Sequence, residues 1–307
     1  MSIPPVPAAY FGILLIWSTT PLAIRWSVQE VDFTFAVLTR MLIGLTVSLA
    51  LLIFARTKFP FHPRARLAYA VGGVALFGSM ALSYWAANYI HSGLISVMFG
   101  LAPLMASVMA AILLGEKSLT TGKVAGLFLG ILGLSFIFLE GDQLGGEYFL
   151  GGLIAMFFSV FFYSAGLVWL KHINDDSPPL ATTVGALAVA SVLFALLWLI
   201  MDGGAVPDSL PLRSGASIVY LGVFGSALAF TLYYYVIKHV RATRIVLINI
   251  ITPVMALMLG NWLNAEEITL NLWLGTILIL LGLAANQPEL IQPILRRFGK
   301  EDKVVSE

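Results

Sequence analysis

Apolar residues dominate long stretches of this chain, and short polar segments separate the stretches. Each stretch runs for about 20 residues without the alternation of a barrel strand, which favours helices that cross a hydrocarbon core roughly 30 Å thick. Ten such stretches can be counted, at 6–24, 33–55, 67–90, 94–114, 121–139, 148–170, 181–201, 214–237, 245–263 and 270–286. We therefore predict an all-α integral membrane protein with ten transmembrane helices.

The composition agrees with this pattern. Hydrophobic residues make up 59% of the 307 residues, charged residues 11%, and the mean hydropathy is +0.94, which leaves too little polar surface to coat a water-soluble globule. Met1 to Pro7 lack Lys and Arg, so we expect no secretory signal. The chain has no cysteine, which excludes disulfides and thiolate metal sites. Its net charge of +1 predicts no partner by itself, and no nucleic-acid partner is expected.

The second half of the chain repeats the first. Matched residues in the segments 77–134 and 224–283 lie 147 to 150 positions apart. They are Phe77-Gly78-Ser79 with Phe224-Gly225-Ser226, Pro103 with Pro253, Gly115-Glu116 with Ala265-Glu266, Gly126 with Gly275, and Gly133 with Gly282. Because each copy holds an odd number of spans, the copies must have opposite orientations in the membrane. We predict two inverted five-helix repeats around a central cavity, residues 1–143 and 144–286, followed by a cytoplasmic tail, 287–307.

The charges of the loops predict the orientation. With both termini in the cytoplasm, fourteen Lys and Arg residues lie inside and only Arg25 and Arg213 lie outside, in agreement with the positive-inside rule. The number of Lys and Arg residues also differs between loops that the repeat aligns. The turn 91–93 has none and its counterpart 238–244 has three, as expected if the two loops lie on opposite sides of the membrane. We therefore expect both termini to be cytoplasmic.

The groups that catalysis needs are not gathered in the sequence. The four histidines lie at segment ends or in loops, and the sixteen Asp and Glu residues lie in loops, at helix ends or in the tail. We predict a transporter and not an enzyme, with no catalytic residue, no metal site and no cofactor. Without a carboxylate inside the membrane to carry a proton or coordinate sodium, we expect facilitated transport down the substrate gradient.

Arg40 is the charged residue that lies well inside a span. It follows Asp32 by eight residues, which places it roughly 12 Å deep at about 1.5 Å per residue. A charge at that depth suggests a functional role, in which Arg40 would meet the carboxylate of a substrate. In the structural alternative, the side chain reaches outward to pair with Asp32 or Glu30, or caps a broken helix.

Glycine and proline interrupt several spans. The interruptions are Pro21, the pair Gly78 and Gly225, and the pair Pro103 and Pro253. Breaks at corresponding positions of two repeats are typical of the binding site of a carrier, so we predict that these residues are hinges. The alternative is a static kink that only shapes the bundle.

Polar and aromatic residues recur near these breaks. Tyr84, Asn88 and His91 are expected to share one helical face, and Trp17 lies near the centre of the first span. The predicted substrate-binding residues are Trp17, Thr20, Arg40, Tyr84, Asn88, Ser96, Phe99, Tyr163, Trp169, Tyr234 and Asn249. Trp169 also fits an interfacial belt, and the Ser and Asn residues also suit hydrogen bonds between helices.

Gly122, Gly126 and Gly130 form a ridge of small residues in the fifth span. Such a ridge allows close approach of another helix. We favour packing inside the bundle over dimerisation, and predict a monomer or weak homodimer.

These residues resemble the drug/metabolite transporter superfamily, in particular its ten-helix exporters with two EamA-type repeats. The resemblance rests on Ile16-Trp17-Ser18 with Arg25, on Arg40, and on the block from Pro103 to Glu116 followed by Gly126 and Gly133. The second copy departs from it with Ala265 before Glu266. Within the superfamily, the chain is similar to bacterial inner-membrane exporters of aromatic amino acids.

This resemblance implies a multi-pass protein of the bacterial inner membrane, with the lipid bilayer and a small-molecule substrate as its partners. The substrate would be an amino acid, foremost an aromatic one, or a similar amphipathic metabolite, exported by alternating access. The alternatives are a cationic drug efflux carrier and, in another class, a non-transporting membrane scaffold subunit.

Overall fold

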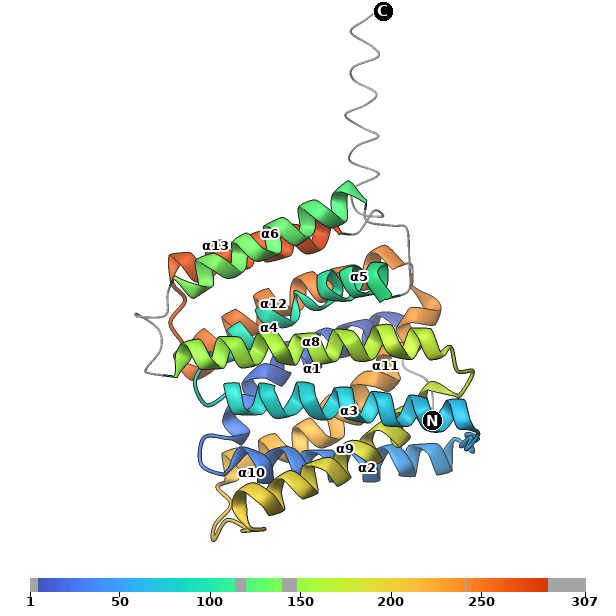
Figure 1. The fold of residues 1–307 in the computed structure, drawn as a ribbon. Helices are drawn as coiled ribbons and strands as arrows, with labels where there is room; N and C mark the ends of the chain where they lie inside the picture. Colours follow the sequence, from blue (N-terminus) through green and yellow to red (C-terminus); the bar gives the residue numbers. More distant parts are fainter. Residues whose placement is uncertain (1–4, 114–119, 140–147, 241, 287–307) are drawn as a thin grey trace, which may run out of the picture.

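The fold is a bundle of helices that lie side by side (Figure 1). The computed structural model describes residues 5–113, 120–139, 148–240 and 242–286, apart from the side chains of 230, 233, 234, 237, 238 and 242–246. Its elements are α1 (Val6–Ser27), α2 (Phe33–Phe54), α3 (Pro63–Ala86), α4 (Ser92–Phe99), α5 (Ala102–Leu113), α6 (Thr121–Phe138), α8 (Phe149–Ile173), α9 (Pro179–Asp202), α10 (Leu212–Tyr220), the π-helix η1 (Leu221–Leu228), α11 (Ala229–His239), α12 (Ala242–Asn264) and α13 (Leu270–Ala285). Over these ranges the chain contains no strand.

The helices confirm the predicted fold class. In the described part of the chain, eight helices are long and apolar enough to cross a membrane, with α4 and α5 counted together as Ser92–Leu113. Two shorter apolar helices, Leu212–Leu228 and Leu270–Ala285, bring the total to about ten. The protein is therefore an all-α membrane protein with the number of spans that the apolar stretches predict.

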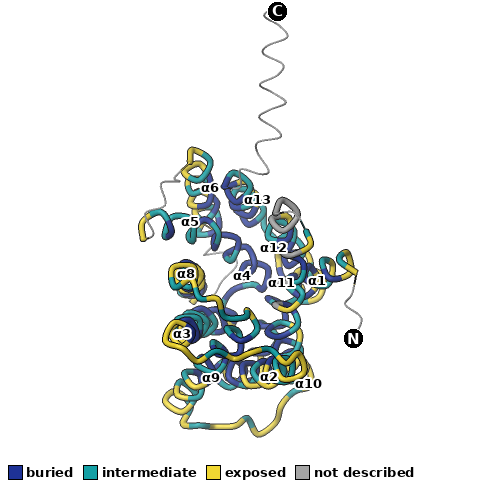
Figure 2. The backbone as a smooth tube through the Cα atoms, turned by 90° about the vertical axis from the view of Figure 1, so that its right-hand side faces the viewer, coloured by how far each residue is buried: buried dark blue, intermediate teal, exposed yellow. Residues whose placement is uncertain are grey.

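The bundle exposes apolar side chains outward, as a lipid-facing protein should. Buried residues concentrate where helices meet, and exposed residues lie on the outer sides (Figure 2). Phe54 and Ile200, for example, are 86% and 81% exposed. Because lipid tails are as apolar as these side chains, close packing rather than apolar burial must hold the helices together.

The glycine ridge of α6 provides such packing. Cβ atoms on Gly122 and Gly126 would each lie 2.5 Å from a carbonyl oxygen of α13, those of Ala285 and Gly282. Beyond the ridge, a Cβ on Gly133 would lie 2.6 Å from the carbonyl oxygen of Gly275. Only glycine permits this approach of two backbones. Gly122 and Gly126 of the ridge therefore pack against α13, and the two helices run antiparallel. The preference for a monomer or weak homodimer stays a prediction.

The predicted hinge prolines have different surroundings. The chain breaks at Gly100 and Leu101, between α4 and α5 and just before Pro103, because proline cannot donate a helical hydrogen bond. Pro21 and Pro253 instead lie inside the continuous helices α1 and α12. The two prolines that the repeat aligns therefore differ in local structure, and their role as hinges stays a prediction.

Gly78 and Gly225 also differ, although the repeat aligns them. Gly78 lies in the uninterrupted α3, where a Cβ would lie 2.7 Å from the Phe162 ring of α8. It is a close-packing position. Gly225 instead lies in the π-helix η1, a rare conformation that is frequent at functional sites.

Candidate functional site

Arg40 is buried in the bundle, with 6% of its surface exposed. Its Nε donates to Oγ of Ser226 over 3.2 Å, and its Nη1 donates to Oη of Tyr84 over 3.2 Å. Nη1 also lies 3.9 Å from Sδ of Met80. The guanidinium carbon is 5.7 Å from the centre of the Tyr84 ring, within cation–π range. Within the described part of the chain, the partners of this buried cation are neutral.

The expectation that Arg40 pairs with a nearby acid is wrong. Asp32 and Glu30 are exposed, and in the described chain the ion pairs within 4 Å join Arg25 to Glu266 and His62 to Asp175. The side chain of Arg40 turns into the bundle and not outward to the interface. No acid of the described residues therefore compensates its charge, and such a charge is costly in a membrane protein.

The π-helix η1 brings Ser226 to Arg40. The Ser226 hydroxyl donates to the carbonyl oxygen of Leu221, five residues earlier, over 3.1 Å, and accepts the bond from Nε. Glycine allows α2 and η1 to approach, since a Cβ on Gly44 would lie 2.9 Å from Cβ of Ser226 and one on Gly222 would lie 2.6 Å from Cβ of Ile43. Residues far apart in the sequence thus form one site.

Thr20 and Gly225 complete the surroundings of the guanidinium. A Cβ on Gly225 would lie 3.6 Å from Nη2 of Arg40 and 3.7 Å from Oγ1 of Thr20. The structure therefore brings together four residues that the sequence singles out, Thr20, Arg40, Tyr84 and Gly225. Ser226 and Met80 are site residues that the sequence pattern did not indicate, although Ser226 belongs to the repeated Phe-Gly-Ser motif.

Other predicted residues lie in separate groups. Phe99 packs edge-on against Tyr163, with ring centres 5.7 Å apart, and Ser96 is buried one turn earlier in α4. Trp17 packs against a small apolar cluster of α1, α11 and α12 that includes Ile13 and Ile248.

The remaining predicted residues are less enclosed. Trp169 is 51% exposed, in keeping with an interfacial belt, and Asn249 is half-buried in α12. The side chain of Tyr234 lies outside the described part of the structure.

The predicted common face of Tyr84, Asn88 and His91 is wrong. Helix α3 ends at Ala86, so Asn88 and His91 lie beyond it. Asn88 is exposed, and its Nδ2 donates to carbonyl oxygens near the end of α3. It stabilises the helix end and does not face Arg40.

Glu266 forms a second charged cluster, which the sequence analysis missed. Its carboxylate accepts hydrogen bonds from the Ser92 backbone over 3.0 Å, the Ser92 hydroxyl over 2.9 Å, the Gly93 backbone over 3.3 Å and Nδ2 of Asn264 over 2.8 Å. Nε of Arg25 lies 3.6 Å away. Glu266 thus caps the amino end of α4, where a negative charge is favourable.

Arg25 extends this cluster to the end of α3. Its Nη1 donates to the carbonyl oxygens of Ala87 and Ile90. A Cβ on Gly93 would lie 2.7 Å from Cα of Leu257, so α4 also packs tightly against α12. The sequence feature that could have indicated this cluster is the acid repeated in both halves, Glu116 after Gly115 and Glu266 after Ala265. It entered the prediction only as a matched position of the repeat.

His91 lies beside the same cluster, directly before α4. Burial lowers the pKa of His91 below its usual value, and the nearby charge of Arg25 lowers it further. The carboxylates of Glu266 and Glu267 oppose this shift. Neutral His91 is therefore favoured in the folded protein.

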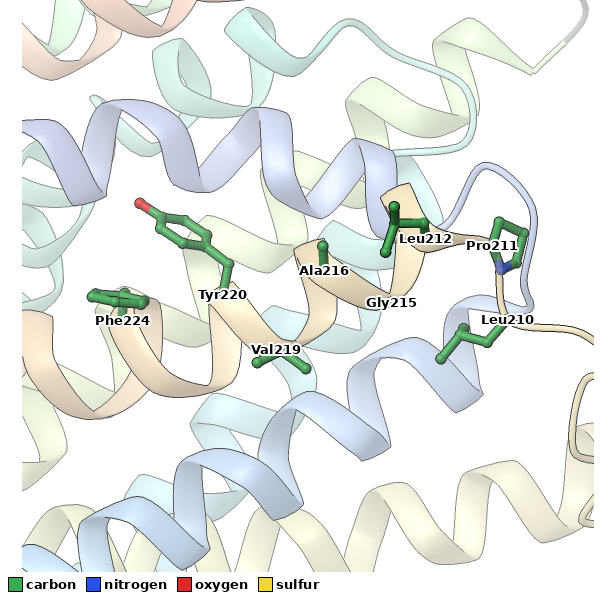
Figure 3. Close-up of a pocket in the computed structure, with 8 residues that line it drawn as sticks. All are labelled: Leu210, Pro211, Leu212, Gly215, Ala216, Val219, Tyr220 and Phe224. Carbon is green, nitrogen blue, oxygen red and sulfur yellow. The ribbon is translucent and has the colours of Figure 1, made fainter.

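An apolar groove lies along α10 and η1 (Figure 3). It has a volume of about 480 Å³ and is lined by Leu210, Pro211, Leu212, Gly215, Ala216, Val219, Tyr220 and Phe224. The rings of Tyr220 and Phe224 stack with centres 5.3 Å apart. Oη of Tyr220 and Oγ1 of Thr19 are 2.6 Å apart, which ties this part of the groove to α1.

Comparison with known proteins agrees with this architecture. The model of the EamA-like transporter family matches residues 8–139 and again residues 150–286. The chain belongs to this family. The contact between Arg40 and Ser226 joins the two matched segments of the EamA chain.

Several relatives of this EamA protein are named as transporters. An uncharacterized transporter of Archaeoglobus fulgidus is 27% identical over 274 residues, covering 87% of this chain and 93% of the relative. The uncharacterized transporter YoaV of Bacillus subtilis is 24% identical, with 90% and 94% covered. The uncharacterized inner membrane transporter YedA of Escherichia coli is 26% identical, with 88% and 87% covered. This protein is accordingly a multi-pass membrane transporter.

A solved structure shares the fold. It is described only as a crystal structure of a protein, and it matches with a TM-score of 0.65 and 21% identity over 94% of this chain and 98% of that chain. At this identity the likeness concerns the fold alone.

Proposed function

We propose that this EamA-family transporter exports amino acids, foremost aromatic ones, or similar amphipathic metabolites by alternating access. The observation that carries the proposal is the buried guanidinium of Arg40 with neutral partners only. A buried charge without a counter-ion destabilises the protein unless something compensates it. An anionic group of a substrate supplies that compensation.

The surroundings of Arg40 favour an organic solute with one negative charge. Tyr84 presents an aromatic ring and a hydroxyl beside the guanidinium, and Thr20 and Ser226 add further hydroxyls. A phosphate or nucleotide would require several cations. A cationic drug would be repelled by Arg40, so this observation supports the amino acid alternative over cationic drug efflux.

Alternating access is supported by the antiparallel pairing of helices. Besides α6 with α13, the start of α2 meets the end of α9, where Thr34 donates to Asp202. The start of α4 likewise meets the end of α12, since a Cβ on Gly260 would lie 2.8 Å from Oγ of Ser92. These are the pairings that two inverted five-helix halves would produce. Rocking of one half against the other would alter the contact between Arg40 and Ser226.

Facilitated transport is supported by the positions of the carboxylates. In the described chain, the acids lie at helix ends or in connecting segments, and none contacts Arg40. Glu266 is buried, but it accepts hydrogen bonds from Ser92, at the start of α4, and from Asn264, and does not contact Arg40. A carrier coupled to protons or sodium would need a titratable or coordinating group in the substrate pathway.

Counterflow in proteoliposomes tests the proposal. Labelled tryptophan, phenylalanine and threonine are offered to the wild-type protein, to Arg40→Gln and to the control Arg66→Gln, which removes an exposed arginine of α3. We expect flux of the aromatic amino acids, a loss of at least about tenfold in Arg40→Gln, or about 1.4 kcal/mol, and no loss in the control. Absence of flux with all three amino acids contradicts the amino acid assignment, and flux that requires an imposed pH or sodium gradient contradicts facilitated transport.

A further inference from the structure

One edge of the Arg40 guanidinium has no partner among the residues that the structure describes. Nε donates to Ser226 and Nη1 to Tyr84, whereas Nη2 makes no hydrogen bond with any residue that the structure describes. Arg40 keeps 6% of its surface exposed, and Nη2 is not among the described side-chain atoms that are both fully enclosed and without a partner. A buried cation with an open donor edge favours an anion at that edge.

Thr20 and Gly225 bound this open edge. A Cβ on Gly225 would lie in ordinary contact with both Nη2 and the Thr20 hydroxyl, at 3.6 and 3.7 Å. The Thr20 hydroxyl donates to the carbonyl oxygen of Ile16 over 2.6 Å, so it contributes no further donor. The missing side chain at Gly225 therefore leaves the space that a ligand oxygen needs beside Nη2.

The charges around this edge determine which ligand fits. One guanidinium matches one carboxylate, whereas a phosphate dianion would need more than one cation. The positive charge of Arg40 would repel an ammonium group of the substrate. Among the described residues, no carboxylate contacts Arg40 that could bind this ammonium group instead. The site can thus recognise a carboxylate by charge but cannot recognise an amino group in that way.

We infer that the Nη2 edge between Thr20 and Gly225 is a carboxylate subsite, and that it takes substrates by their carboxylate without requiring an amino group. The substrate class is amphipathic monocarboxylates with an aromatic or apolar body, amino acids included. This inference rests on the proposed function because it concerns the same site. It names Gly225 as the residue that limits the size of the subsite.

Three related probes separate the two ends of an amino acid. L-phenylalanine carries both groups, 3-phenylpropionate carries only the carboxylate, and 2-phenylethylamine carries only the ammonium. Titration calorimetry on the purified chain should show binding of both carboxylates, with dissociation constants within about tenfold of each other, which is about 1.4 kcal/mol. The amine should not bind.

Two matched variants test the geometry. Gly225→Ala should weaken both carboxylates at least about tenfold, or about 1.4 kcal/mol, because its methyl group occupies the space beside Nη2. Gly151→Ala, whose Cβ would lie 3.4 Å from the Trp85 side chain in another part of the bundle, should leave both affinities unchanged. Arg40→Gln should abolish binding of both carboxylates, and circular dichroism verifies that each variant is folded.

The outcomes distinguish this inference from the proposed function. Binding of phenylalanine without 3-phenylpropionate, or unchanged affinity in a folded Gly225→Ala protein, overturns the subsite and leaves the amino acid exporter intact. Failure of both carboxylates to bind, together with no phenylalanine flux in counterflow, overturns both proposals.

Discussion

Arg40 and Glu266 are both buried charges, and their surroundings are opposite. Glu266 is 6% exposed and accepts hydrogen bonds from two backbone amides, a hydroxyl and a side-chain amide, with a guanidinium 3.6 Å away. Arg40 is equally buried, but its partners are two hydroxyls and a sulfur atom, and one edge stays open. The first charge is satisfied by the protein, whereas the second is not.

This difference separates a structural charge from a functional one. Satisfied buried charges hold elements together, and removal of one partner is strongly destabilising. An unsatisfied buried charge contributes little to folding and is retained for another reason. Glu266 therefore connects α1, α4 and the end of α12, and Arg40 is the better candidate for contact with a substrate.

The largest expected effect is the loss of Glu266. In Glu266→Ala, the charge of Arg25 and the amino end of α4 lose their partner, so we expect the free energy of unfolding to fall by about 3–5 kcal/mol. Denaturant unfolding in mixed micelles measures this change. Glu267→Ala, which removes an exposed neighbouring acid, is the control.

The same unfolding measurement on Arg40→Gln gives the comparison with Glu266→Ala. Because Arg40 has no counter-ion among the described residues, we expect Arg40→Gln to lower the free energy of unfolding by no more than about 1 kcal/mol. An equal loss of stability in Arg40→Gln and Glu266→Ala would contradict the distinction between the two charges.

The pH dependence of stability should arise at the Glu266 cluster. The pKa of His91 is lowered by burial, so the unfolded chain binds more protons than the folded protein once the pH falls below about 6.5. The contribution of His91 is thus fully present above this pH and is lost as the pH falls toward the folded pKa. The slope for one proton is at most about 1.4 kcal/mol per pH unit.

Unfolding of the wild-type protein and of His91→Gln between pH 7.5 and 5.5 measures this contribution. We expect the variant to lose less stability on acidification, and Glu266, Arg25 and Glu267 are the charged groups that act on His91. Identical pH profiles would show that His91 does not respond to this cluster.

A smaller effect on stability is expected at Ala265, the residue directly before Glu266. Ala265 has a φ of +50°, in the left-handed region that is costly for a residue with a Cβ. The equivalent residue in the first half is Gly115. We expect Ala265→Gly to raise the free energy of unfolding by about 0.5 kcal/mol, after the entropy cost of glycine is subtracted.

Ala70→Gly is the matched control for this change, because Ala70 lies exposed within helix α3. There glycine should lower stability by about 1 kcal/mol. Destabilisation by both substitutions in the same unfolding assay would show that the positive φ of Ala265 stores no strain.

The sequence predicted the spans well because a membrane span must be apolar over its own length, whatever it packs against. It also placed Arg40 inside a span and selected Thr20, Tyr84 and Gly225 separately. It could not show that these residues meet, because they come from α1, α2, α3 and η1. It also treated Gly78 and Gly225 as equivalent, although packing against Phe162 and the π-helix give them different environments.

The sequence by itself determined the class of the protein, its ten apolar stretches and the position of Arg40 within one of them, because these follow from local composition. Only the tertiary structure decided which charge is satisfied. Arg40 meets Ser226 across 186 positions of the chain, and Glu266 meets Ser92 across 174. Hydrogen bonds over such separations depend on how the helices pack, and here glycine positions such as Gly44 and Gly260 allow the approach.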